Sequence, residues 1–386
     1  MIFTLEALKA KHGDSLLLHY GDPSSPQLIL IDGGPGGVYK KVLKTRLDEI
    51  KSSRFPDERL PIRLLMVSHI DDDHIAGILD LSHDLVNLQE AGTELPYDIE
   101  TLWHNSFDDI VGNQPEELFA SLKTAAIPVA TGGAVPSGLP LSRPGAAVVA
   151  GVPQSRGLRQ NAEKLSLNIN FGFPGLVLAP KSGEKTVKMG SSLNFTVIGP
   201  DQQKLEDLQE EWDKQLKKMK KAKTQEAMVM AAAFIDKSVF NLASIVVLAQ
   251  AGNHSMLLTG DARGDEIIEG LKKLGLLKSG KLHVDLLKVP HHGSDRNVST
   301  DFFRQITADH YIISADGKYG NPEIATLKMM SEARGKDAYK VYLTNKESRL
   351  EDFYKREKAS RKKCEYVFGS KDALSVKVDL DDPLKD

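Results

Sequence analysis

A single cysteine, Cys364, is present among the 386 residues of this chain. One thiol can form no disulfide within the chain, and it cannot supply the cysteine clusters of structural zinc sites. A metal ion bound here would therefore have histidine and carboxylate ligands. Because Cys364 lies in no motif typical of a catalytic thiol, we expect it to be chemically inert.

Long apolar stretches are also missing from the sequence. The longest candidates, 228–235 and 242–252, are much shorter than the roughly 20 residues that a membrane-spanning helix needs. The first residues contain no basic segment followed by an apolar run, so we expect no secretory signal peptide. These observations predict a cytoplasmic protein without a membrane partner.

Neither sign of charge dominates, since 50 basic and 53 acidic residues leave a formal net charge of -3. This balance excludes a global basic field of the kind that attracts nucleic acid, although local basic segments remain. Hydrophobic residues make up 41% of the chain and charged residues 27%, which is typical of a soluble globular protein. A chain of this length fits one large α/β domain with insertions.

Hydrophobic periodicity predicts strands that alternate with helices. We expect strands at 15–20, 27–31, 63–68, 101–103, 193–198, 244–250, 255–259, 284–289, 311–314, 339–343 and 373–378. We expect helices at 39–53, from 75 onwards, at 264–274 and at 324–334. This alternation favours an α/β architecture.

We expect a single domain over residues 1–386 that carries three additions. Residues 110–190, which are rich in glycine and proline, are predicted to be a variable insertion. A helical, lysine-rich insertion is expected at about 201–235, and a charged C-terminal extension at about 346–386. The basic stretch at 355–363 lies in that extension.

The helical insertion is predicted from apolar residues that recur at helical spacing, which are Leu205, Leu208, Trp212, Leu216 and Met219. Six lysines lie in the same segment, namely Lys214, Lys217, Lys218, Lys220, Lys221 and Lys223. The lysine run is interpreted either as a solvated helix face or as a patch that follows a phosphate backbone.

The densest group of potential metal ligands follows the strand expected at 63–68. Four candidates lie within six residues, namely His69, Asp71, Asp73 and His74. Imidazoles together with carboxylates suit Zn²⁺, Mn²⁺ or Fe better than Mg²⁺, which prefers oxygen ligands alone. The alternative is a polar helix N-terminus, but capping needs one aspartate rather than three beside two histidines.

Two further strands end in residues suited to the same chemistry. Asp261 follows the apolar strand at 255–259 and is preceded by a glycine. His291 and His292 follow the buried strand at 284–289, where adjacent histidines rarely serve packing alone. These three strand ends together predict a site built from histidine and aspartate.

The same segments resemble the metallo-β-lactamase superfamily, and in particular the branch found in the extracellular domain of ComEC-type DNA-uptake proteins. The motifs occur in the order of that family: HGDS at 12–15, LIDGG at 30–34, SHIDDDHIAG at 68–77, NLAS at 241–244, LLTGD at 257–261 and KVPHHGS at 288–294. The resemblance spans residues 1–345, with breaks at 110–190 and 201–235. It implies an α/β (α+β) fold, the four-layer αββα metallo-β-lactamase sandwich, with a helical insertion.

The resemblance also implies a site for two divalent metal ions, Zn or Mn, at the strand ends. It assigns His69 and Asp71 to one ion, and Asp73 and His74 to the other. Asp261 would be the carboxylate that bridges the two ions. Either Asp73 or Asp261 would accept a proton during the reaction.

Further roles follow from the same resemblance. His292 is the expected metal ligand of its pair, whereas His291 is expected to face the substrate and to hold or protonate a phosphate. Asp32 would orient the ligands through hydrogen bonds. Ser294 and Asn321 are expected to contact the substrate.

The sequence departs from the family pattern at several positions. Asp71 stands where the wider superfamily has histidine, which favours a harder metal such as Mn²⁺. Ala76 replaces the first of two glycines, and Asn321 replaces the histidine of a Tyr-Gly-His-Pro motif. The histidine that the superfamily carries mid-chain has one candidate here, His104, which is interpreted either as a supporting residue of the site or as a structural histidine.

The resemblance implies a metal-dependent hydrolase that uses a metal-bound hydroxide, with a phosphodiester of nucleic acid or nucleotide as substrate. The first alternative is a hydrolase of a small-molecule ester or lactone. The second is a non-catalytic protein partner in a multi-protein system, for example an anti-phage system. The retained His and Asp candidates argue against the last of these.

Overall fold

The computed structural model describes residues 1–106, 109–110, 143–183, 185–219, 243–360 and 363–384. Its first sheet has seven strands in the order β17 (Ser375–Asp379), β1 (Ile2–Leu8), β2 (Leu16–Asp22), β3 (Ser25–Ile31), β5 (Leu64–Val67), β7 (Thr101–His104) and β8 (Asn168–Ile169). The strands from β17 to β3 pair antiparallel, and those from β3 to β8 pair parallel. A separate pair is formed by β4 (Leu60–Ile62) and β6 (Tyr97–Ile99).

The second sheet has eight strands, in the order β16 (Cys364–Phe368), β15 (Tyr339–Leu343), β14 (Ile306–Ile313), β13 (Leu282–Lys288), β12 (His254–Leu258), β11 (Val246–Ala251), β10 (Leu193–Gly199) and β9 (Thr186–Met189). The strands from β16 to β12 are parallel to one another, and the remaining three pair antiparallel. The carboxyl ends of β12, β13 and β14 therefore meet at one edge of this sheet.

The central core consists of side chains that the two sheets bury against each other. Phe3 and Leu5 of β1 and Leu18 of β2 belong to the same apolar cluster as Phe195 of β10 and Leu286 of β13. Each of these side chains is fully buried. Alternate residues of a strand point to opposite faces of the sheet, so the remaining positions are available to pack against helices.

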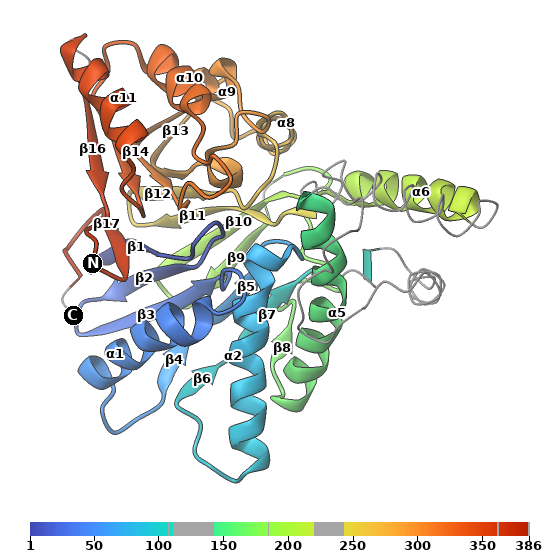
Figure 1. Ribbon diagram of the computed structural model, residues 1–386. Coiled ribbons are helices and arrows are strands. Elements are labelled where there is room, and N and C mark those ends of the chain that lie inside the picture. The colour runs from blue at the N-terminus through green and yellow to red at the C-terminus, as the bar shows by residue number, and fades with distance from the viewer. Residues whose placement is uncertain (107–108, 111–142, 184, 220–242, 361–362, 385–386) are drawn as a thin grey trace.

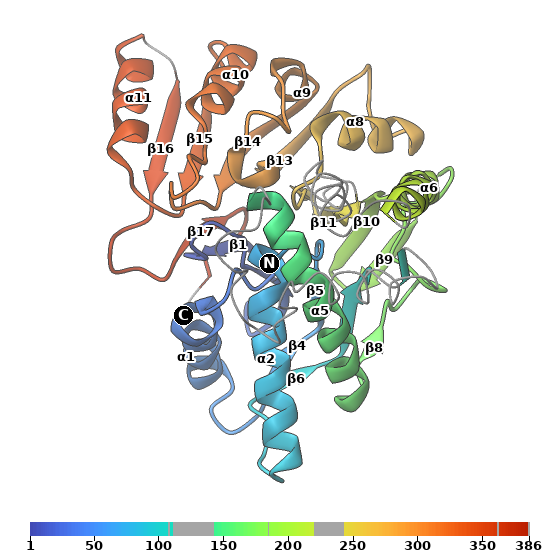
Figure 2. The ribbon, with the colours of Figure 1, turned by 45° about the vertical axis from the view of Figure 1, so that its right-hand side comes forward.

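Helices cover the outer face of each sheet (Figure 1). The first sheet is covered by α1 (Lys44–Arg54), α2 (Asp72–Glu90) and α5 (Arg143–Lys164), with the short η1 (Tyr39–Leu43) before α1. The second is covered by α8 (Gly264–Lys273), α9 (Thr300–Gln305), α10 (Ile324–Arg334) and α11 (Ser348–Ala359). Figure 2 shows the two groups of helices on opposite sides of the stacked sheets. The fold is thus the four-layer αββα sandwich predicted from the sequence.

Strand β1 (Ile2–Leu8) was not among the predicted strands, although it lies in the first sheet between β17 and β2. Its alternate positions, Thr4 and Glu6, are polar yet buried. The Glu6 carboxylate accepts from Arg46 Nε at 2.8 Å and contacts His19 Nε2 at 3.1 Å. Although burial opposes ionisation, these partners lower the pKa of Glu6 to about 2. Partners from distant segments therefore allow a charged residue in a strand that sequence patterns do not reveal.

The segment predicted as a charged C-terminal extension is built into both sheets. Strand β16 adds an edge to the second sheet, and β17 pairs with β1 in the first. Helix α11 lies between them in the chain and packs on β16. Elsewhere the predicted helix at 324–334 and the predicted strand at 339–343 are confirmed at their predicted bounds as α10 and β15.

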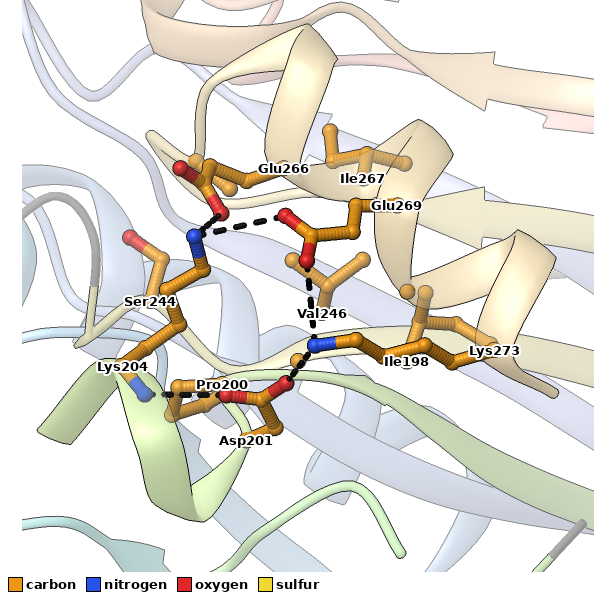
Figure 3. Close-up of a pocket in the computed structure, with 13 residues that line it drawn as sticks. Ile198, Pro200, Asp201, Lys204, Ser244, Val246, Glu266, Ile267, Glu269 and Lys273 are labelled. Carbon is orange, nitrogen blue, oxygen red and sulfur yellow. Dashed lines mark hydrogen bonds and ion pairs between the residues drawn. The ribbon is translucent and has the colours of Figure 1, made fainter. Parts of the chain in front are cut away.

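The helix predicted after residue 201 is α6 (Gln202–Met219). Its first turn is fixed to α8 by ion pairs that line a small cavity (Figure 3). Lys204 Nζ lies 2.6 Å from Glu266 Oε2 and 3.3 Å from Glu269 Oε2, and Lys273 pairs with Asp201 on the same side. These charged groups pair with one another, and the ion pairs hold the first turn of α6 against α8.

The lysine run of this insertion lies mostly outside the residues whose side chains the structure describes. Of the six lysines only the Lys214 side chain is described, and it is 60% exposed and 3.7 Å from Glu210 Oε2. The apolar face is represented by Leu205, which is buried. In the described part of the chain, no helix is long and apolar enough to span a membrane.

Candidate metal centre

Polar residues gather where β5, β12 and β13 end. Strand β5 is followed by Ser68 and His69, β12 leads to Asp261, and β13 leads to His291 and His292. The main chain joins the two sheets at this place, because Ile245 N donates to Ser68 O at 2.8 Å. The three strand ends singled out in the sequence therefore meet in one location.

Close backbone contacts hold the first turn of α2 against the loop after β3. Gly33 N donates to His74 O at 2.7 Å, and Gly77 N donates to Gly34 O at 2.9 Å. A Cβ atom on Gly77 would lie 1.9 Å from Gly33 O, so only glycine fits there. This packing explains the glycines that flank Asp32 and His74 in the sequence.

The turn that carries the two adjacent histidines is strained. His291 has φ 48° and His292 has φ 53°, which is the left-handed region that non-glycine residues rarely occupy. Such conformations cost on the order of 1–3 kcal/mol each and are found mainly at functional sites. The strain turns the two imidazoles apart, with 79° between their ring planes.

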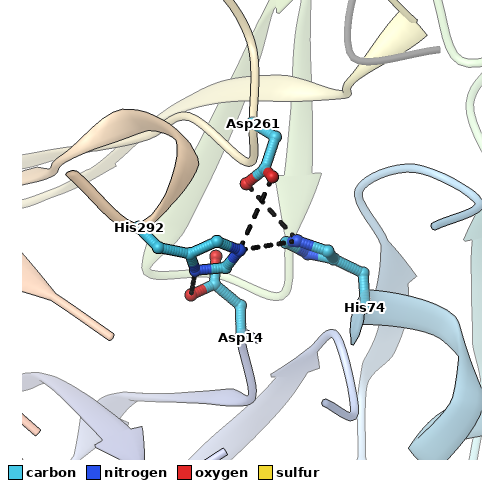
Figure 4. Close-up of side chains that lie close together, drawn as sticks. All are labelled: Asp14, His74, Asp261 and His292. Carbon is cyan, nitrogen blue, oxygen red and sulfur yellow. Dashed lines mark hydrogen bonds and ion pairs between the residues drawn. The ribbon is translucent and has the colours of Figure 1, made fainter. Parts of the chain in front are cut away.

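Four buried side chains offer ligand atoms that all lie within 4.8 Å of one another (Figure 4). They are Asp14, His74, Asp261 and His292, which come from four different segments of the chain. His74 Nε2 and His292 Nε2 face each other at 3.3 Å, and Asp261 Oδ1 lies 3.3 Å from His74 Nε2. This is the tightest grouping of the site.

Asp261 lies at the middle of a wider group. Its Oδ2 is 3.5 Å from His292 Nε2, 3.5 Å from His291 Nε2 and 3.9 Å from His69 Nε2. Its Oδ1 faces His74. Both oxygens of this one carboxylate thus lie close to imidazoles.

Two of the three carboxylates of the SHIDDDH segment, those of Asp71 and Asp73, lie near different histidines of the group. Asp71 Oδ2 lies 3.7 Å from His69 Nε2, whereas Asp73 lies 4.0 Å from His74 Nε2 and 3.6 Å from His292 Nε2. Asp71 occupies the N-cap position of α2, but its side chain makes no capping hydrogen bond. Its carboxylate is therefore directed to the site rather than to the helix.

A second carboxylate stands behind each of the two central imidazoles. Asp32 Oδ2 lies 2.8 Å from His74 Nδ1, and Asp14 Oδ1 lies 3.3 Å from His292 Nδ1. Asp32 also accepts from both the backbone N–H and the hydroxyl of Ser68, each at 2.7 Å. Such partners fix the tautomer and orientation of a histidine whose other nitrogen binds a metal.

Lys288 is buried beside these carboxylates. Its ammonium group pairs with Asp14, donates to Gly260 O at 3.0 Å and lies 3.8 Å from Asp261 Oδ1. Only 1% of the side chain is exposed. A lysine at such a place stays charged because it is surrounded by carboxylates, which raise its pKa against the effect of burial.

The electrostatic potential at the site is strongly negative. Burial alone would lower the pKa of His292, but Asp261 and Asp14 outweigh it and raise that pKa to about 10. The same opposition raises the pKa of His74 well above its ordinary value. Burial alone would raise the pKa of Asp261, but the neighbouring imidazoles hold it well below its usual range. The site therefore attracts positive charge, whether as protons or as metal cations.

The residues present fit a divalent metal cation. Several buried atoms have no hydrogen-bond partner in the described part of the chain, namely His69 Nε2, Asp71 Oδ1 and Asp261 Oδ1. One ammonium group, Lys288, stands against five carboxylates, which are Asp14, Asp32, Asp71, Asp73 and Asp261. This excess of negative charge suits a bound divalent cation. Mixed imidazole and carboxylate donors suit Zn²⁺, Mn²⁺ or Fe.

Two residues of the group reach the surface and mark its open side. The side chain of Asp73 is 20% exposed and that of His291 is 26% exposed, whereas the side chains of His74, Asp261 and His292 are at most 2% exposed. A substrate would therefore approach from the side of Asp73 and His291.

Three other predicted site residues lie outside this group. His104 is buried, with Nε2 2.8 Å from Ser155 Oγ and its backbone N–H donating to Asn170 Oδ1 at 2.8 Å. Burial lowers its pKa to about 4. Ser294 donates its backbone N–H to His291 O at 2.8 Å, and Asn321 accepts from Arg349 Nη2 at 3.2 Å through its backbone oxygen.

Asp14 and Lys288 belong to the HGDS and KVPHHGS motifs, but the sequence predicted no role for either. The structure places both in the site. Each residue has a sequence feature that could have indicated a role. Asp14 precedes a buried strand in the HGDS motif, and Lys288 interrupts the apolar run at 284–289. A charge inside a buried run requires a charged partner, but the sequence does not identify that partner.

No family model matches the chain, and no curated protein matches it. Three solved structures are similar to it over most of its length. A metal-dependent hydrolase from Parabacteroides distasonis is 11% identical, with 88% of this chain and 92% of that chain covered and a TM-score of 0.35. Human tRNase Z, short form, is 10% identical, with 97% and 98% covered and a TM-score of 0.35. CmlA, a diiron β-hydroxylase from Streptomyces venezuelae, is 11% identical, with 97% and 54% covered and a TM-score of 0.34.

Similarity of this degree assigns neither a substrate nor a metal to the chain. The interpretation therefore depends on the arrangement of its own residues.

Proposed function

We propose that this protein is a divalent-metal-dependent hydrolase that acts on phosphodiesters of nucleic acid or nucleotide. The observation that carries the proposal is the convergence of His69, Asp71, Asp73, His74, Asp261 and His292 at the joined ends of two sheets. Their donor set and their excess of negative charge fit two divalent ions, Zn or Mn.

The ligands divide naturally around Asp261. His69 and Asp71 would hold one ion, while His74, His292 and Asp73 would hold the other. When bound, the two ions supply Lewis-acid chemistry, because they lower the pKa of a water and neutralise negative charge on the group under attack. Asp32 holds the imidazole of His74 in place, and Ser314 O holds that of His292, with Asp14 Oδ1 at 3.3 Å.

His291 is suited to exchange a proton with the substrate. Asn297 Nδ2 donates to Asp261 O at 3.0 Å, so the Asn297 Oδ1 atom is an acceptor and His291 Nδ1, 2.9 Å away, must carry a hydrogen. The Nε2 atom is then the nitrogen that takes up or releases a proton. Because this side chain is at the open side of the site, protonated Nε2 can donate to a phosphoryl oxygen.

The choice of a phosphodiester rests on the resemblance to the DNA-uptake branch of the metallo-β-lactamase superfamily. The SHIDDDH, LLTGD and KVPHHGS segments of that resemblance would supply the metal ligands and His291. Esters and lactones, and a non-catalytic role, remain as alternative outcomes of the experiment.

Hydrolysis of a panel of substrates tests the proposal. Purified protein supplied with Mn²⁺ or Zn²⁺ is expected to cleave bis(p-nitrophenyl) phosphate and plasmid DNA, and to lose this activity in a chelator. Asp261→Asn is expected to be inactive, whereas Asp285→Asn, a matched change at a carboxylate that pairs with His254, is expected to retain activity. Cleavage of p-nitrophenyl acetate or a lactone alone would favour the small-molecule alternative. If the protein cleaves none of these substrates, the proposed catalytic function is contradicted.

The adjacent histidines are expected to separate into two phenotypes. His292→Ala should lower the metal content, because the buried His292 Nε2 lies close to both His74 and Asp73, contacts that His291 lacks. His291→Ala should keep the metal and lose about 10²–10⁴-fold in turnover, as expected for a proton-transfer group. Elemental analysis of both variants measures the first effect, and equal metal loss in the two would show that the assignment is wrong.

A further inference from the structure

A loop formed by residues 315–322 lies beside the metal centre, and contacts at both of its ends hold it to the segments that carry Asp14, His291 and His292. At its start, Ser314 O lies 3.1 Å from His292 Nδ1, and Ser314 Oγ donates to Gly13 O at 2.7 Å. At its end, Glu323 N donates to Gly293 O at 3.0 Å. The loop therefore spans from the segment of Asp14 to that of His291 and His292.

An arginine holds the C-terminal end of this loop. Arg349 Nη1 donates to Pro322 O at 2.8 Å and its Nη2 donates to Asn321 O at 3.2 Å. Arg349 is itself held by Glu347, whose Oε2 accepts from Nε at 2.8 Å. A Cβ atom on Gly293 would lie 2.6 Å from Pro322 Cβ, so the end of the loop packs closely on the histidine turn. Lys318 and Tyr319, at the tip, therefore belong to a loop whose C-terminal end is fixed by hydrogen bonds and close packing.

The tip carries an aromatic ring and a positive charge. Tyr319 is 44% exposed, and within the described residues only Phe171 is another large hydrophobic side chain as exposed as this. Lys318 Nζ lies 4.8 Å from the centre of the Tyr319 ring, and the His12 ring meets it edge-on at 4.8 Å. His12 Nδ1 is buried without a hydrogen-bond partner among the described residues.

We propose that Tyr319, Lys318 and His12 form a binding subsite for a nucleotide unit next to the scissile phosphodiester, with the base stacked on Tyr319 and a flanking phosphate paired with Lys318. This inference rests on the proposed function, because it takes the metal centre as the place of cleavage. An exposed ring beside a lysine is the combination with which proteins bind single-stranded nucleic acid without reading its sequence. The subsite would therefore favour nucleotide substrates over phosphodiesters that lack a base.

Binding of two matched strands tests the subsite. The probes are fluorescein-labelled hexathymidylate with phosphorothioate linkages, which resist cleavage, and an abasic strand of the same length and charge. Tyr319→Ala is expected to weaken binding of hexathymidylate by roughly tenfold to a hundredfold and to leave binding of the abasic strand unchanged. Tyr319→Phe keeps the ring and is expected to bind both strands as the unchanged protein does.

The lysine is expected to act on both strands alike. Lys318→Gln should weaken both and reduce the slope of log affinity against log salt by about 0.7. Lys281 is an exposed lysine just before the amino end of β13. Lys281→Gln is therefore the matched control, and it should change the affinity for neither strand. Fluorescence anisotropy gives each affinity, and elemental analysis checks that the metal content of every variant is unaltered.

The outcomes separate this inference from the proposed function. Equal affinity of wild type and Tyr319→Ala for hexathymidylate would overturn the subsite, even if the protein cleaves phosphodiesters. Binding that depends on Tyr319 in a protein that cleaves no phosphodiester would support the subsite and contradict the proposed function. Failure of the unchanged protein to prefer hexathymidylate over the abasic strand would also overturn the subsite.

Discussion

Replacing both His69 and His74 with alanine is expected to strip the protein of bound divalent metal and to abolish hydrolysis. Each histidine faces a different oxygen of Asp261, with His69 Nε2 3.9 Å from Oδ2 and His74 Nε2 3.3 Å from Oδ1. In the proposed centre, the double variant removes one nitrogen ligand of each ion. Loss of Lewis-acid stabilisation worth several kcal/mol corresponds to a fall in turnover on the order of 10³-fold or more.

Elemental analysis of protein grown with Zn²⁺ and Mn²⁺ supplied measures the result, with about two ions per chain expected for the unchanged protein. His283→Ala is the matched control, because the His283 side chain is 55% exposed and pairs with Asp309 away from the strand ends. This control should keep both metal and activity. Unchanged protein without bound metal, or a double variant that still holds two ions, would contradict the proposed centre.

Lys288→Met is expected to destabilise the fold by about 3–5 kcal/mol, which is the usual effect of removing one partner from a buried ion pair. The ammonium group is enclosed by the Asp14 carboxylate, Gly260 O and Asp261. Without it, Asp14 becomes a buried charge whose remaining neighbours include the imidazole of His292. Methionine has a similar length, so the effect measured is mainly that of the lost charge.

Urea unfolding in the presence of chelator, followed by circular dichroism, gives the stability difference. Asp14→Asn combined with Lys288→Met should be less destabilised than the sum of the two single variants, because the double change removes both charges of the pair. Lys281→Met is the control, and a surface change of this kind should stay within about 0.5 kcal/mol. Strict additivity of Asp14→Asn and Lys288→Met would show that the two groups do not depend on each other.

The local elements of the fold could be predicted well because their signals are contained in short segments. Helix α10 and strand β15 have their predicted bounds, since the apolar spacing at 324–334 and at 339–343 reflects burial on one face or both. Strand β1 was missed for the opposite reason. Its Glu6 is acceptable in a buried position only because Arg46 and His19 reach it from other segments.

The place of the candidate site could also be predicted, since its residues follow strand ends. His69, Asp261 and His292 each stand just after a buried apolar run, and the sandwich brings such ends together. The sequence shows only which residues are close to one another along the chain, however. His74 and His292 are 218 residues apart, and their contact at 3.3 Å depends on the stacking of the two sheets.

By itself the sequence determined the set of side chains that can carry the chemistry: imidazoles and carboxylates, without a cysteine, at the ends of buried strands. Only the tertiary structure decided how the carboxylates divide, with Asp261 at the centre and Asp14 and Asp32 behind the imidazoles of His292 and His74. All of them are aspartates with the same intrinsic chemistry. What distinguishes them is which atoms they face inside the fold, and long-range packing sets that geometry.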